Sequence, residues 1–301
     1  MGATLPPISS PTGKCYVVDT GGAGATAMAT LAGATTVDLG RVDVLSGTPR
    51  AGLIDRWIYV FTAAIFIVVT LTGFIPDSMH MLADVRSGAR PPLPWVLHLH
   101  AVLMGSFLLL LLTQTVLMAT GRPARHRQLG MVAFGVAAML VVVGLILATT
   151  MYHLAWHAAQ GAPPETRAAL DKVVLRKGNI LLLQSSIGLL FSLFLIIGAR
   201  ARARDAGLHK RMMILAPAVT MLAGIDRIGW LPTSLPSSPI ASEFYVLATV
   251  APMVVWDVVR NRSVHRAYWI WLSFAVPVAI AVNLLWDTPG WQRIAPVIMG
   301  V

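Results

Sequence analysis

Seven apolar runs, each long enough to cross a membrane as a helix, constrain the fold of this chain more than any other feature of its sequence. A bilayer core of roughly 30 Å is crossed by about 20 helical residues. The runs are Trp57–Ile75, Pro94–Ala119, Leu129–Tyr152, Gly178–Ala199, Met212–Leu231, Glu243–Val259 and Ala267–Trp286. Because no alternating, strand-like segments lie between them, the sequence predicts an all-α integral membrane bundle of seven transmembrane helices rather than a barrel.

Composition supports a membrane protein and argues against nucleic-acid binding. Hydrophobic residues make up 56% of the chain and charged residues only 12%, and the mean hydropathy is +0.72. The net charge of +10 lies beside the apolar runs, where Lys and Arg set topology and attract anionic lipid headgroups. We therefore expect a multi-pass protein of a bacterial cytoplasmic (inner) membrane whose main partner is the lipid bilayer.

The basic residues also predict the orientation, since cytoplasmic loops hold the excess of Lys and Arg. Three short connections carry them, at residues 122–127, 200–211 and 260–266. The connections on the other side, such as residues 160–177, mix both signs of charge. The pattern predicts a cytoplasmic N-terminus and a C-terminus outside.

Three regions follow from this pattern. Residues 1–50 are rich in Gly, Ala, Thr and Pro and contain the only cysteine, Cys15, so we expect a disordered cytoplasmic tail; Met28 is an alternative start. Residues 51–290 form the transmembrane domain, and 291–301 form a short outer tail. Without a second cysteine there is no intrachain disulfide and no cysteine-based metal site.

Histidines at one end of the bundle repeat a pattern. His126, His209 and His265 are each followed by a cation at the start of an apolar run on the predicted cytoplasmic side. One interpretation is that they anchor the helices at the membrane surface. The other is that these three imidazoles approach one another in an inner layer, with Asp257 as a partner.

The outer layer, on the side opposite the basic connections, holds the histidines that we expect to bind a cofactor. His98 and His100 are two residues apart, so they point about 200° apart on a helix and only one of them can face a given neighbour. His153 and His157 are four residues apart and share one helix face, a spacing that can present two imidazoles to one metal.

Ionisable residues inside an apolar run add to this outer layer. Asp226 and Arg227 lie within the fifth run, and such residues cost about 3 kcal/mol each on insertion scales. Asn179, Gln184 and Glu243 are expected at a similar depth. The predicted metal set is His98, His153, His157 and Asp226, with Gln184, Arg227 and Glu243 around it; the alternative is a hydrogen-bond network that holds the helices in register.

Several motifs resemble a group of bacterial multi-pass membrane proteins of unknown function. The motifs are HLHAVL with Gln114 downstream, GRPARHRQLG, LHKRMMILA followed by Asp226-Arg227, and WDVVRNRSVHRAYW. A weaker similarity, through the His-Arg helix starts, is to small membrane proteins of terminal-oxidase assembly. That similarity implies haem or copper handling and a respiratory complex as a partner.

Three function classes remain from the sequence. The first is a haem or copper protein in redox transfer or oxidase assembly, the second a cofactor-free scaffold or transporter, and the third a membrane-embedded metal hydrolase, which fits the span count. The common motifs of soluble enzymes are absent, which favours a non-enzymatic role. With an outer site, His98 or His100 should lie close to His153, and His153→Ala rather than His126→Ala should remove the cofactor.

Overall fold

The computed structural model describes residues 49–301, and every regular element in this part of the chain is a helix. The helices are α1 (Pro49–Arg86), α2 (Trp95–Ala119), α3 (Pro123–Gln160), α4 (Pro164–Ala201), α5 (Ala206–Ala218), α6 (Met221–Ile225), α7 (Ile240–Asn261), α8 (Arg266–Leu285) and α9 (Pro289–Met299). The all-α prediction is confirmed. The predicted N-terminal tail lies outside the described residues, apart from its last two.

Six of these helices, α1 to α4, α7 and α8, are long and apolar enough to cross a membrane. They match six of the seven predicted runs, so the multi-pass character of the chain follows from length and composition. Helices α3 and α4 each continue well beyond the apolar run that predicted them, to 38 residues apiece.

The remaining run, Met212–Leu231, is divided between two short helices. Pro217 is the last but one residue of α5, and proline both lacks an N–H and disturbs the preceding turn. The backbone N–H and hydroxyl of Thr220 both donate to the Pro217 carbonyl, at 3.0 and 2.8 Å. Helix α6 then begins at Met221 and ends at Ile225, so neither helix alone is long enough to span a bilayer.

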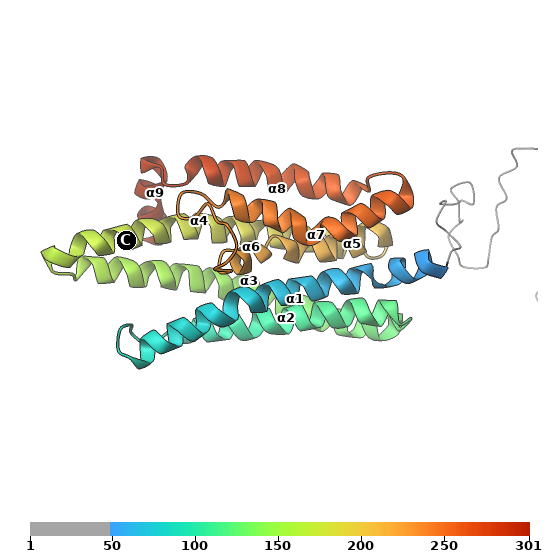
Figure 1. The fold of residues 1–301 in the computed structure, drawn as a ribbon, viewed down its shortest axis with the longest axis horizontal. Helices are drawn as coiled ribbons and strands as arrows, with labels where there is room; N and C mark the ends of the chain where they lie inside the picture. Colours follow the sequence, from blue (N-terminus) through green and yellow to red (C-terminus); the bar gives the residue numbers. More distant parts are fainter. Residues whose placement is uncertain (1–48) are drawn as a thin grey trace, which may run out of the picture. The chain divides into compact units, whose positions relative to one another are not determined.

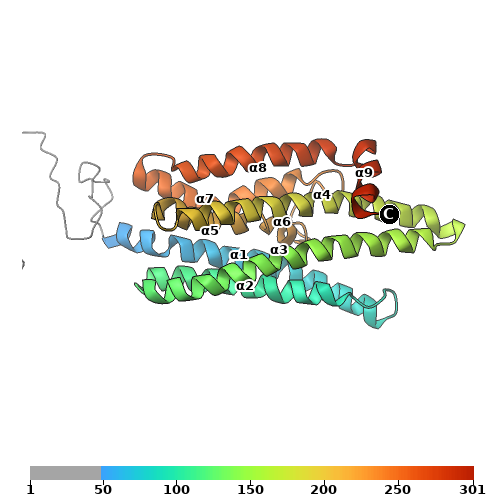
Figure 2. The ribbon, with the colours of Figure 1, turned by 180° about the vertical axis from the view of Figure 1, so that it is seen from behind.

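Helices α1 to α4 alternate in direction, as do α7 and α8, which gives the bundle two ends (Figures 1 and 2). One end holds the start of α1 and the turns α2–α3, α4–α5 and α7–α8; we call it the basic end, after the cations at residues 122–127, 200–211 and 260–266. The opposite end holds the turns α1–α2 and α3–α4 and the short helix α9 (Figure 1). Helix α4 packs against α3, α5, α8 and α9, while α1 packs against α2, α6 and α7.

Local sequence signals place the turns at the basic end. Gly121 adopts a left-handed φ of +71°, and Pro123 occupies the first turn of α3, where its missing N–H costs no hydrogen bond. Asp205 caps α5 by accepting from the Leu208 N–H at 2.8 Å. His265 caps α8 in the same way, because its Nδ1 accepts from the Ala267 N–H at 3.1 Å.

One close approach between helices requires glycine. A Cβ added to Gly73 of α1 would lie 2.0 Å from the Gly224 carbonyl oxygen of α6. Such small-residue contacts let helix backbones approach in a membrane, where apolar lipid gives no hydrophobic driving force.

The C-terminal residues 291–301, predicted as a short tail, belong mostly to α9. The Trp291 indole donates to the Gly178 carbonyl of α4 at 2.9 Å. The other end of α9 contacts α3 through the Met299 carbonyl and His153.

Candidate functional site

The histidines at the opposite end of the bundle contact different parts of the structure. His153 and His157 share a helix face as predicted, with ring centroids 6.0 Å apart. His153 Nε2 lies 2.8 Å from the Met299 carbonyl oxygen. His98 is exposed near the start of α2, whereas His100 packs beside Gly144 of α3, whose added Cβ would lie 3.5 Å from His100 Cε1.

These residues do not assemble into the metal set expected from the sequence. Among residues 49–301 there is no group of three or more His, Cys, Asp or Glu side chains that could hold a metal ion. Asp226, the expected carboxylate ligand, instead accepts a short hydrogen bond from the Ser242 hydroxyl. The structure therefore does not bring His98, His153, His157 and Asp226 together.

The other polar residues of this layer connect helices to one another. Arg227 forms an ion pair with Asp77 of α1 at 3.0 Å. The amide of Asn283 on α8 donates to both carboxylate oxygens of Glu243 on α7, at 3.1 and 3.0 Å.

Asn179 and Gln184 complete the predicted outer layer. Asn179 is buried and hydrogen-bonds Asp287 and Gln292, whereas Gln184 is exposed. These contacts match the alternative interpretation, a network that holds helices in register.

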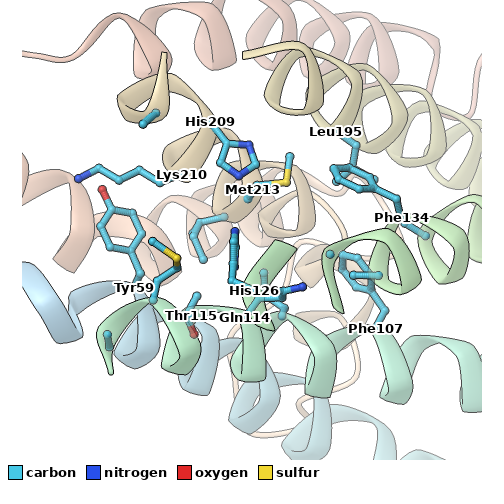
Figure 3. A pocket seen from close by; sticks show the side chains of 18 of the residues that line it. Tyr59, Phe107, Gln114, Thr115, His126, Phe134, Leu195, His209, Lys210 and Met213 are labelled. Carbon is cyan, nitrogen blue, oxygen red and sulfur yellow. The ribbon is translucent and has the colours of Figure 1, made fainter. Parts of the chain in front are cut away.

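At the basic end, two histidines from different helices face each other. His126 lies in the first turn of α3 and His209 in the first turn of α5. Their ring centroids are 6.4 Å apart, and the rings are nearly perpendicular, at 78°. Figure 3 shows the two imidazoles pointing toward one another across a cavity.

The backbone fixes the orientation of His209. Its Nδ1 lies 2.8 Å from the Gly198 carbonyl oxygen. A carbonyl can only accept, so Nδ1 carries a proton and donates it, which leaves Nε2 for another partner. The buried Nδ1 of His126 has no hydrogen-bond partner among the described residues.

The cavity beside this pair has a volume of about 330 Å³, within the usual range of roughly 300–1,000 Å³ for small-molecule pockets. Its apolar walls come from α2, α3, α4 and α5 and include Phe107, Leu111, Ala133, Phe134, Ala137, Leu195, Met213 and Ile214. Gly130, one turn after His126, also lines the cavity, and a Cβ added there would lie 3.5 Å from Gln114 Nε2. Figure 3 shows Phe107, Phe134 and Leu195 on one side of the histidines, and Tyr59 and Lys210 on the other.

Buried polar atoms without a partner gather around this cavity. They are the Tyr59 hydroxyl, His126 Nδ1 and both amide atoms of Gln114, all from residues that line it. Such atoms are rare in folded proteins and call for a ligand or water. The sequence signal for Gln114 is its position as a polar residue inside an apolar run.

The third histidine and the acid of the predicted inner layer lie apart from this cavity. His265 caps α8. Asp257 accepts two hydrogen bonds from Arg211, at 2.5 and 2.8 Å, and a short one from the Tyr268 hydroxyl. The predicted inner layer is thus two sites: a histidine pair and a buried ion pair.

Comparison with known protein families, curated proteins and solved structures finds no match to this chain.

Proposed function

We propose that this chain binds haem at the basic end, with His126 and His209 as the two axial ligands, and that it transfers electrons within the membrane. The observation that carries the proposal is the separation and orientation of these two imidazoles across an apolar cavity. The proposed cofactor lies at the basic end, whereas the spacing of His153 and His157 in the sequence favours the opposite end.

The ring separation supports one metal between the two histidines. An imidazole nitrogen binds a metal at about 2 Å and its ring centre lies about 1 Å further back, so two axial imidazoles set their centroids roughly 6 Å apart. The separation here is 6.4 Å. His209 has the partner expected of a metal ligand, since its Nδ1 proton is held by the Gly198 carbonyl.

The walls support a flat apolar ligand. Phe107, Phe134 and Leu195 surround the cavity on the side of the bundle's middle, and Gly130 carries no side chain that would fill it. A haem held by both imidazoles would have no open iron position for a substrate, so the chemistry it would supply is electron transfer rather than oxygen chemistry. Redox exchange with a respiratory complex is the partner role that fits this chemistry.

Copper is a second candidate, favoured by one observation. The thioethers of Met118 and Met213 line the same cavity as the histidine pair, and thioether with imidazole is a ligand set that suits Cu(I). A hydrolytic zinc site has less support, because it commonly takes three protein ligands of the His or carboxylate type.

The topology belongs to the same proposal. We infer seven crossings, with α5 and α6 together forming the fifth, the basic end in the cytoplasm of a bacterial cell and the C-terminus outside. The short basic turns support this orientation. A cysteine introduced at Arg204 in a Cys15→Ser background should resist a membrane-impermeant maleimide added from outside; its labelling would reverse the orientation.

A visible spectrum of the detergent-purified protein, titrated with ferric protoporphyrin IX and analysed for metals, tests the cofactor. We expect a six-coordinate low-spin Soret band that is lost in His126→Ala and His209→Ala and kept in the matched control His153→Ala. Stoichiometric copper without a Soret band would select the second candidate. A protein that binds neither would contradict both and favour a scaffold or transporter.

A further inference from the structure

The mouth of the cavity at the basic end carries an excess of positive charge. Asp55 is the carboxylate that lines it, and Asp55 is already used: it accepts from the Trp256 indole at 2.8 Å and from Arg260 at 2.7 Å. The two cations that line the cavity are Arg56 and Lys210. Arg260, which does not line the cavity, thus neutralises Asp55. Arg56 and Lys210 both remain for a ligand.

Neither lining cation forms a direct ion pair in the described part of the chain, and Asp55 and Asp257 act on Lys210 only through longer-range charge. No carboxylate there lies within ion-pair distance of Arg56 or Lys210. The Lys210 ammonium instead lies over the Tyr59 ring, 5.2 Å from its centroid. The Tyr59 hydroxyl is buried without a hydrogen-bond partner, so the mouth offers two cations and one unused hydroxyl donor.

The cavity is therefore polar at one end and apolar at the other. Lys210 follows the axial candidate His209 directly, and Figure 3 shows Lys210 and Tyr59 on one side of the histidine pair with Phe107 and Phe134 on the other. Protoporphyrin has the same asymmetry, since its two carboxylates lie on one edge and apolar substituents on the opposite edge. Charge-assisted hydrogen bonds from Lys and Arg to carboxylates are among the strongest in proteins.

We propose that Arg56, Lys210 and the Tyr59 hydroxyl bind the two carboxylates of the porphyrin, so that the ligand class of this site is a dicarboxylate iron porphyrin whose acidic edge faces the basic end. This inference rests on the proposed function, because it requires a porphyrin between His126 and His209. It adds a selectivity that the histidine pair alone lacks. Porphyrins without free carboxylates should bind less tightly, since they cannot accept charge-assisted hydrogen bonds from the two cations.

The test compares two probes on the purified full chain: ferric protoporphyrin IX and its dimethyl ester, which keeps the ring and the iron but removes both charges. The wild type should bind the free acid at least tenfold more tightly by Soret titration. Arg56→Gln and Lys210→Met should each weaken free-acid binding about tenfold, the change that a loss of about 1.4 kcal/mol gives. Both variants should bind the ester as the wild type does. Tyr59→Phe should weaken free-acid binding by less.

Arg122→Gln is the matched control, because Arg122 is a cation at the same end that does not line the cavity. It should keep the preference of the wild type for the free acid. Equal binding of acid and ester by the wild type, or equal losses in Arg122→Gln and Lys210→Met, would overturn the inference while a Soret band that depends on His126 and His209 upholds the proposed function. Absence of a Soret band with both probes would overturn both. Unchanged thermal unfolding of each variant shows that its loss is not misfolding.

Discussion

Removing the carboxylate of Asp257 should be among the most destabilising single changes in the bundle. Asp257 and Arg211 are both buried, with side-chain exposures of 8% and 6%. The pair joins α7 to α5 through two hydrogen bonds at 2.5 and 2.8 Å, and Tyr268 of α8 donates a third. Deleting one partner of a buried pair costs about 3–5 kcal/mol, because the other charge stays buried without compensation. We expect Asp257→Ala to lower the free energy of unfolding by this amount.

Unfolding of the purified protein by increasing SDS in mixed micelles, followed by circular dichroism, measures the change. The double variant Arg211→Met/Asp257→Leu should recover most of the loss, because it buries no charge. The control is Asp171→Ala: the pair with Arg167 is 3.7 Å long and exposed, so its loss should cost less than about 1 kcal/mol. The reasoning is refuted if Asp257→Ala costs no more than this control, or if the double variant is as unstable as the single one.

Two further changes test the local structure. Asp205→Ala should cost about 1 kcal/mol by removing the cap of α5. The Leu208 N–H is the main cause that lowers the pKa of Asp205, so this stability is complete above the unfolded pKa of about 3.9 and is lost as pH falls through the lower folded pKa. The difference in thermal unfolding between variant and wild type should therefore be full at pH 7 and shrink as the pH falls below the unfolded pKa. Gly73→Val should lower the free energy of unfolding by about 1–3 kcal/mol, because the new side chain pushes α1 away from the Gly224 carbonyl of α6. The control Gly105→Val has nothing near its added Cβ and should unfold almost as the wild type does.

Much of the fold follows from the sequence because the bilayer imposes a length on each helix. Six apolar runs predicted six long helices, since a backbone in lipid must satisfy its own hydrogen bonds. The fifth run shows the limit of this argument. Its hydropathy resembles that of the others, but Pro217 and the turn at Thr220 divide it into α5 and α6. Apolar composition does not report such a break.

The candidate site was harder to predict because it depends on helices far apart in the sequence. The four-residue spacing of His153 and His157 correctly predicted a shared face, since that relation is local. The approach of His126 to His209 depends on how α3 and α5 each pack against α4. The sequence placed both residues at the same end, but it could not separate them from His265, whose ring is used by the start of α8.

Carbonyl groups at helix ends orient two of the imidazoles in this bundle. The last four carbonyls of a helix have no partner within it. Gly198 lies in the last turn of α4 and Met299 ends α9, and each carbonyl orients one imidazole, His209 or His153. His153 and His157 project from one helix, so they would reach a flat ring from the same side. His126 and His209 come from different helices and line one cavity, which is the arrangement that the proposed porphyrin requires.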